Sequence, residues 1–201
     1  MRSLPCDARV DTVLRGDTEV FVAMSESVVF IGDAWSAGFR WEAWFPEYEI
    51  HGFAFVGGTD EVLEHVDSVL EITPSAVVVQ VGASDLCQGR SDEHIVRNIE
   101  SILYGLRKGL PFCHIVVHSV PPLKPDLASL LRSINHHLRQ FAPTVKARYI
   151  DLWPALADPD GSLSLNWSND KLHLTDEGLG AWVSLLRPAL IDMFEQSHLS
   201  A

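Results

Sequence analysis

The sequence contains few cysteines, few basic residues and no long apolar run. Three cysteines occur among 201 residues, and none forms a CxxC or Cys/His pattern of the kind that binds a metal. This usage predicts reduced thiols in a cytoplasmic protein without a metal site. The N-terminal residues lack the apolar core of a signal peptide, and no stretch approaches the roughly 18–20 apolar residues of a membrane span. We therefore expect a cytoplasmic protein with no membrane span.

The shortage of basic residues restricts the classes of partner. Lys and Arg together number 15 against 27 Asp and Glu, which gives a net charge of −12. Nucleic acids and anionic membranes are bound through cationic surfaces, so this charge disfavours both as partners. A small-molecule ligand is the class that the composition leaves open.

The length and the apolar content predict one domain. With 47% apolar residues, the chain can bury a substantial core, and its low glycine and proline counts argue against extensive disorder. We interpret residues 27–201 as the domain and residues 1–26 as an extension packed on its edge. Within the extension, residues 9–15 suggest a short helical turn and residues 19–23 a short strand.

Apolar periodicity predicts strands that alternate with helices. Short runs rich in Val and Ile indicate five strands, at residues 27–32, 49–56, 75–81, 114–120 and 147–152. Apolar stripes at helical spacing indicate helices at residues 59–70, 91–109, 126–142 and 176–195, the last of them kinked or interrupted at Pro188. This alternation predicts an α/β fold in which a parallel five-stranded sheet carries helices on both faces.

Glycine-rich turns follow three of the predicted strands. They lie at residues 32–34, 57–58 and 82–85, and in a parallel sheet all three emerge at the same edge. Backbone N–H groups that converge in such turns can bind an anion or an oxyanion. Asp170 and His173 precede the last helix, and at this spacing the carboxylate can orient the imidazole as a general base. The sequence therefore predicts an acyl-transfer site at this edge.

At these turns the chain resembles the SGNH (GDSL-type) serine hydrolases over residues 27 to about 190. The family reads Gly-Asp-Ser, Gly, Gly-x-Asn-Asp and Asp-x-x-His in this order. The resemblance implies a three-layer α/β/α flavodoxin-like sandwich with a mostly parallel sheet, no cofactor, and cleavage of an ester, thioester or O-acyl-glycan substrate through an acyl-enzyme. It assigns the nucleophile position to Ala34, the base and its partner to His173 and Asp170, and the oxyanion hole to the backbone of Ala34, to Gly57 (with Gly58 as the alternative) and to Ser84.

Two departures from the family pattern affect the expected activity. Ala34 stands where the family has its serine nucleophile, so we expect the chain to be nearly inactive. Either the serine was replaced by design, or the chain is a natural pseudoenzyme that binds an acylated or glycan ligand or a partner protein. Ser84 replaces the family's asparagine and offers one shorter hydrogen-bond donor.

Several other residues allow a functional and a structural interpretation. Ser36 and Cys87 are alternative nucleophiles, although Cys87 is more readily interpreted as a small packing residue. His118 is expected either to point at the site or to lie in the core. The aromatic stretch at residues 39–48 either covers the sheet, which we favour, or forms an apolar wall for a substrate.

Overall fold

The computed structural model describes residues 12–13, 20–21, 25–36 and 38–200, so most of the predicted extension lies outside it. Two short strands of that extension are described, β1 (Thr12–Val13) and β2 (Val20–Phe21), and they pair antiparallel. Strand β2 falls within the strand predicted at residues 19–23. The helical turn expected at residues 9–15 is wrong at Thr12 and Val13, because these β-branched residues pair with β2 instead.

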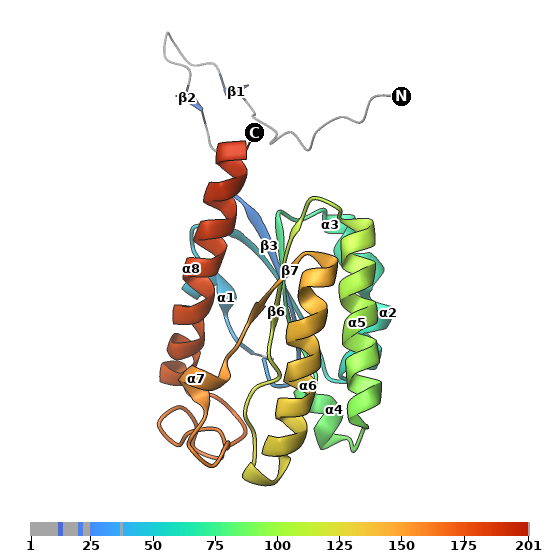
Figure 1. The fold of residues 1–201 in the computed structure, drawn as a ribbon. Helices are drawn as coiled ribbons and strands as arrows, with labels where there is room; N and C mark the ends of the chain where they lie inside the picture. Colours follow the sequence, from blue (N-terminus) through green and yellow to red (C-terminus); the bar gives the residue numbers. More distant parts are fainter. Residues whose placement is uncertain (1–11, 14–19, 22–24, 37, 201) are drawn as a thin grey trace.

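Five parallel strands form the central sheet in the order β4-β3-β5-β6-β7 (Figure 1). Every neighbouring pair is parallel, which confirms the predicted α/β class. The strands run over β3 (Ser27–Asp33), β4 (Glu49–Phe55), β5 (Ala76–Gln80), β6 (His114–His118) and β7 (Ala147–Ile150). Because all five are parallel, the glycine-rich turns after β3, β4 and β5 meet at one edge of the sheet.

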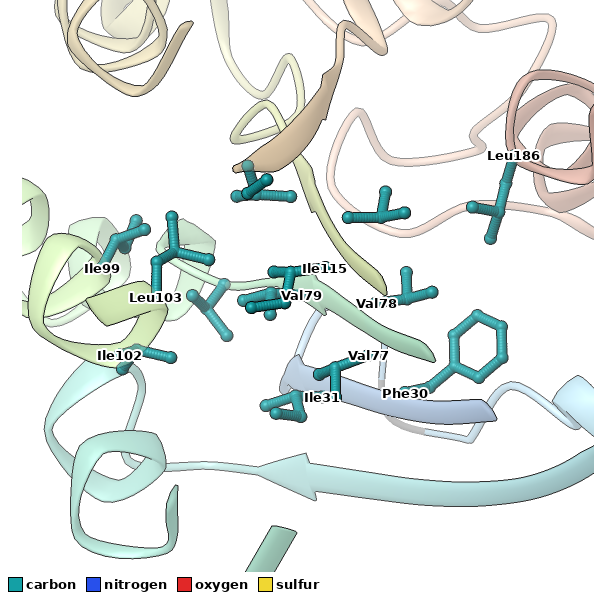
Figure 2. Packing of buried hydrophobic residues seen from close by; sticks show 14 of the residues in the cluster. Phe30, Ile31, Val77, Val78, Val79, Ile99, Ile102, Leu103, Ile115 and Leu186 are labelled. Carbon is teal, nitrogen blue, oxygen red and sulfur yellow. The ribbon is translucent and has the colours of Figure 1, made fainter. Parts of the chain in front are cut away.

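The central strands are buried on both faces. All five residues of β5 are buried, as a strand covered by helices on both sides requires. Figure 2 shows the alternation, with Val79 directed toward Ile99 and Leu103 on one face and Val78 directed toward Leu186 on the other. This packing is the reason the sequence shows continuous apolar runs at the strands.

Helices cover the two faces and complete the predicted three-layer sandwich (Figure 1). One face carries α2 (Thr59–Glu64), α3 (Val66–Ile72), α5 (Asp92–Gly109) and α6 (Ala128–Phe141), the last of them flanked by the 3₁₀ turns η1 (Pro125–Leu127) and η2 (Ala142–Val145). The other face carries α1 (Trp41–Trp44), the short α7 (Trp153–Leu156) and α8 (Asp176–Ser200). Helix α4 (Ala83–Cys87) lies directly after β5. Within the described ranges, none of the helices combines the length and apolar character needed to cross a bilayer.

Two helices differ from the prediction. The single helix expected at residues 59–70 breaks at His65, whose ring Nδ1 lies 2.8 Å from the carbonyl oxygen of Glu61. That carbonyl would accept the N–H of His65 in a continuous helix, but the N–H bonds to Val62 instead. Helix α8 continues through Pro188 to Ser200, so the expected interruption is absent.

The aromatic stretch forms a packed layer between the sheet and α8. Trp41 stacks on Phe30 of β3, with ring centroids 4.3 Å apart, and meets Trp182 of α8 edge-on at 5.0 Å. Phe45 and Trp182 are fully buried. The favoured interpretation of residues 39–48 as a cover for the sheet is therefore confirmed.

Candidate active site

A cleft of about 250 Å³ opens at the carboxyl ends of β3, β4 and β5. It brings together three of the residues predicted from the sequence, Ala34, Ser84 and His173. Its remaining lining is mostly apolar and comes from Trp35, Val56, Ala83, Cys87, Gln88 and Leu172. Of the other two predicted residues, Gly57 follows Val56 in the chain and Asp170 contacts His173. Apart from Cys87, which the sequence marks as an alternative nucleophile, these wall residues were not predicted, because single residues beside a turn carry no pattern of their own.

Asp33 holds the turns after β3 and β5 together. Its side chain is fully buried, and Oδ1 accepts the N–H of Trp35 at 3.0 Å. Oδ2 accepts the N–H groups of Gly82 and Ser84, both at 2.9 Å. Burial raises the pKa of this carboxyl group, and the three N–H bonds oppose that rise. Asp33 therefore has a structural role, as an acceptor of three backbone N–H bonds.

The nucleophile position contacts the third glycine-rich turn directly. The N–H of Ala34 donates to the hydroxyl oxygen of Ser84 at 3.1 Å. Ser84 is 8% exposed, so its hydroxyl is enclosed at the floor of the cleft. Two positions that are 50 residues apart in sequence thus form one polar pair. The sequence predicted both residues for the site but not this bond between them.

The glycine turn after β4 has one occupied and one open N–H group. The N–H of Gly57 donates to Oε2 of Glu61 at 2.6 Å. Gly58 has φ of +72° and precedes α2, and its N–H has no hydrogen-bond partner among the described residues. A Cβ at Gly58 would lie 2.5 Å from Oδ2 of Asp85. The same Oδ2 accepts the backbone N–H of Thr59, and Oδ1 of Asp85 accepts the Thr59 hydroxyl. Glycine is therefore required at position 58 by both its backbone angle and its neighbour.

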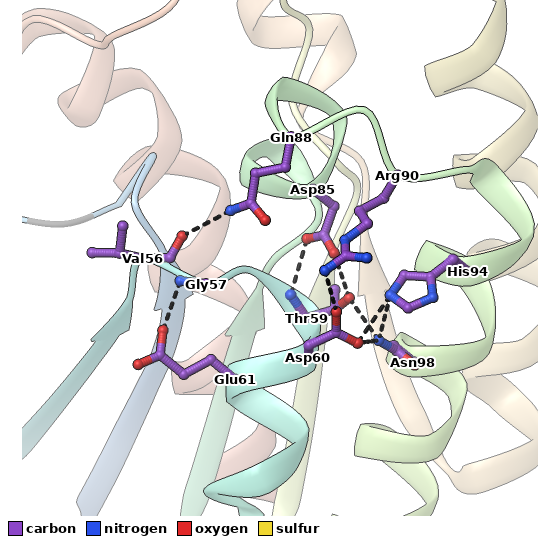
Figure 3. A network of polar contacts seen from close by, with 10 residues as sticks. All are labelled: Val56, Gly57, Thr59, Asp60, Glu61, Asp85, Gln88, Arg90, His94 and Asn98. Carbon is purple, nitrogen blue, oxygen red and sulfur yellow. Dashed lines mark hydrogen bonds and ion pairs between the residues drawn. The ribbon is translucent and has the colours of Figure 1, made fainter.

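A polar network surrounds this turn (Figure 3). Asp60 on α2 accepts from Nδ2 of Asn98 at 2.8 Å and pairs with Arg90 at 3.1 Å. The bond from Asn98 lowers the pKa of Asp60 below its ordinary value. Nε2 of Gln88 donates to the carbonyl of Val56 at 3.1 Å. Helices α4 and α5 therefore both hold the loop that carries Gly57 and Gly58.

His173 and Asp170 form the predicted pair. Nδ1 of His173 lies 2.8 Å from Oδ2 of Asp170, while Oδ1 accepts the backbone N–H groups of His173 and Leu172 at 2.8 and 2.9 Å. The bond from the His173 side chain, followed by these backbone bonds, holds the pKa of Asp170 well below its ordinary value. An ionised carboxylate only accepts, so Nδ1 carries the proton and Nε2 presents a lone pair. Nε2 has no hydrogen-bond partner in the described part of the chain.

Comparisons with known proteins show the family and the fold of this chain. The profile of the GDSL-like Lipase/Acylhydrolase family matches residues 30–180. The chain belongs to this family. The human platelet-activating factor acetylhydrolase IB subunit alpha1 is 28% identical, over 89% of this chain and 83% of that protein. A GDSL-like lipase from Bacteroides thetaiotaomicron superposes with a TM-score of 0.74 at 20% identity, covering 84% of this chain and 89% of that one. A lipase from a goat rumen metagenome superposes with a TM-score of 0.65 at 17% identity, covering 82% and 97%.

Of the residues that allowed both a functional and a structural interpretation, the structure places some at the cleft of this GDSL-like chain and others away from it. Ser36 is buried, and its hydroxyl donates to the carbonyl of Asp33 at 3.2 Å, outside the cleft. His118 is also buried away from the cleft, where Nε2 accepts from Nε1 of Trp182 at 3.1 Å. Cys87 is a free thiol that lines the cleft. None of the aromatic residues 39–48 lines it.

In the part of the chain that the structure describes, no group of three or more His, Cys, Asp or Glu side chains is arranged to hold a metal ion.

Sequence reasoning missed Glu61, whose carboxylate accepts the N–H of Gly57. The available signal was its position in the first turn of a helix that begins directly after the glycine turn.

Proposed function

We propose that the cleft is the acyl-ester site of an SGNH-type esterase or acyltransferase. The observation that carries the proposal is that His173, paired with Asp170, lines the same mostly apolar cleft as Ala34. Family membership supports hydrolase chemistry on acyl esters. Esters, thioesters and O-acylated glycans are the substrates we propose, and the apolar lining suits their acyl groups. The cytoplasmic location stays a prediction.

The proposed mechanism needs a hydroxyl group at position 34. In a variant carrying Ala34→Ser, Nε2 of His173 removes the hydroxyl proton while the oxygen attacks the ester carbonyl carbon. Collapse of the tetrahedral intermediate expels the alkoxide or thiolate, which takes the proton from His173 and leaves an acyl-enzyme. Water, activated in turn by His173, or another acceptor then removes the acyl group. Asp170 keeps the imidazole oriented and stabilises its charged form.

Backbone N–H groups are proposed to stabilise the oxyanion. The N–H of Ala34 is the first donor, and the turn after β4 supplies the second. We assigned the second donor to Gly57, with Gly58 as the alternative. The unoccupied N–H of Gly58 favours the alternative, because the N–H of Gly57 is already bonded to Glu61.

Ala34 closes the covalent route in this chain. The loss of one member of a catalytic triad leaves roughly 10⁻⁴–10⁻⁶ of the rate. Two origins remain open, a serine replaced by design and a natural pseudoenzyme. The second origin implies that the cleft binds an acylated or glycan ligand, or a partner protein, without turnover.

Restoring the hydroxyl tests the proposal. We expect Ala34→Ser to hydrolyse short p-nitrophenyl esters or acyl thioesters, and Ala34→Ser/His173→Ala to lose that activity. Ser101→Ala in the Ala34→Ser background is a matched control, since its hydroxyl bonds only to Arg97 on the surface of α5. If esters, thioesters and O-acetylated sugars are all left intact by folded Ala34→Ser protein, the esterase proposal fails. Ligand binding without turnover in that variant would support the pseudoenzyme instead.

A further inference from the structure

The hydroxyl oxygen of Ser84 accepts a hydrogen bond from the N–H of Ala34, which is a donor that an oxyanion would need. An oxyanion needs the N–H of Ala34 as a free donor, but this N–H donates to Oγ of Ser84 at 3.1 Å. The Ser84 hydroxyl oxygen is therefore already the acceptor for the N–H of Ala34. A substrate oxyanion has to break this bond before it can use the group.

The surrounding bonds hold Ser84 in this position. Its own N–H donates to Oδ2 of Asp33 at 2.9 Å, and Oδ1 of the same carboxylate takes the N–H of Trp35. One buried side chain thus bonds to Ser84 itself and to Trp35, the residue that follows Ala34 in the chain. Ser84 is only 8% exposed, so most of the residue is packed against its neighbours.

The neighbouring turn is occupied in the same way. The N–H of Gly57 donates to the carboxylate of Glu61 at 2.6 Å. While this bond is intact, the N–H of Gly57 is not free to donate to an oxyanion. Two backbone donors beside the cleft are therefore satisfied by side chains of the chain itself, and Gly58 alone offers an open N–H in that turn.

We infer that Ser84 closes the oxyanion donor at position 34, so that the cleft holds an uncharged acyl ester more readily than it stabilises the tetrahedral anion. The inference rests on the proposed function of the cleft. It replaces the role of third oxyanion donor that we expected for Ser84. The ester ground state needs no free N–H at position 34, whereas the transition state does, so the closure acts on kcat and not on KM.

Substitutions in the Ala34→Ser background test the closure. Ser84→Asn introduces an amide donor and frees the N–H at position 34, so we expect kcat to rise by about 10²–10³-fold with KM unchanged. Ser84→Ala frees the N–H without adding a donor, and the release of one net hydrogen bond predicts a rise in kcat of about fivefold. If Ser84→Ala instead lowers kcat, Ser84 is a donor to the oxyanion and the inference is wrong. Ser101→Ala serves again as the control for loss of a serine hydroxyl.

A measurement that needs no activity tests the same contact in the chain as it stands. The N–H of Ala34 should exchange slowly with solvent deuterium, and Ser84→Ala should accelerate its exchange by about fivefold while Gly82 keeps its protection through Asp33. Equal exchange at Ala34 with and without the Ser84 hydroxyl would overturn the inference. Inactive Ala34→Ser protein combined with faster exchange in Ser84→Ala would reject the esterase proposal but retain the closure.

Discussion

His118 should make the stability of this protein depend steeply on pH below neutrality. Its side chain is fully enclosed on β6, and burial lowers the pKa of His118 from 6.5 to about 3. The unfolded chain takes up a proton below about pH 6.5, whereas the folded chain does so only near pH 3. Unfolding is therefore favoured as the pH falls between these values, and the stability associated with His118 is fully present only above pH 6.5.

The magnitude follows from one proton over this interval. One proton changes the free energy of unfolding by about 1.4 kcal/mol per pH unit, so the loss reaches about 5 kcal/mol at the acid limit. His118→Gln removes the titrating group and keeps an acceptor for Nε1 of Trp182. The packing lost in His118→Gln lowers the free energy of unfolding by the same amount at every pH. Any change with pH in the difference between the two free energies of unfolding therefore comes from His118, and it should be about 1.4 kcal/mol per pH unit.

Urea unfolding followed by far-ultraviolet circular dichroism at pH 4, 5, 6 and 7 measures this difference. The other acidic groups titrate in both proteins and cancel in the subtraction. We expect the stability of the His118 protein to fall toward pH 4 relative to that of His118→Gln. Parallel curves across this range would refute the reasoning, since they would mean that the folded protein protonates His118 at an ordinary pKa.

Three further outcomes follow from the site and its supports. Asp33→Asn should lower the free energy of unfolding by about 1–3 kcal/mol in urea, because an amide cannot accept all three N–H bonds. This difference from the parent protein should shrink as the pH rises from about 4 through the raised pKa of Asp33, and a pH-independent difference would contradict that shift. Gly32→Ala should lower the free energy of unfolding by about 1–3 kcal/mol, since its Cβ would lie 1.7 Å from Oγ of Ser36. Adding Ser36→Ala should recover part of this loss, and equal Tm values for the single and double variants would exclude the clash. Asp170→Asn in the Ala34→Ser background should lower kcat by roughly 10²–10⁴-fold in ester hydrolysis, because the amide favours the wrong tautomer of His173, and an unchanged kcat would remove Asp170 from the mechanism.

The elements could be predicted from sequence where the local pattern reflects burial. The valine run of β5 is apolar because helices cover both faces of that strand. The helix predicted at residues 91–109 agrees with α5, and Ser91 caps it by accepting the N–H of His94 at 3.3 Å. The break at His65 was not predictable from periodicity, because one ring nitrogen competes for one carbonyl group there. The interruption expected as one outcome at Pro188 does not occur, because α8 stays helical through this residue.

The candidate site was predictable as a set of positions but not as a set of contacts. Strand ends of a parallel sheet converge, so Ala34 and Ser84 could be placed at one edge before the structure was known. Their hydrogen bond depends on side-chain direction across 50 residues of sequence, and no periodicity encodes it. The carboxylate of Glu61 was overlooked for the same reason, because the sequence marks it only as a residue of a helix's first turn.

The aromatic layer behind the cleft has a spectroscopic consequence. Trp35 lines the cleft, and its ring lies 5.3 Å from that of Trp182 at an interplanar angle of 41°. Two enclosed indoles at this separation couple electronically, so their near-ultraviolet dichroism and emission depend on their mutual orientation. A ligand seated against Trp35 changes that orientation or the polarity beside it. The occupancy of the cleft is thereby recorded by the protein's own chromophores, without a label and without turnover.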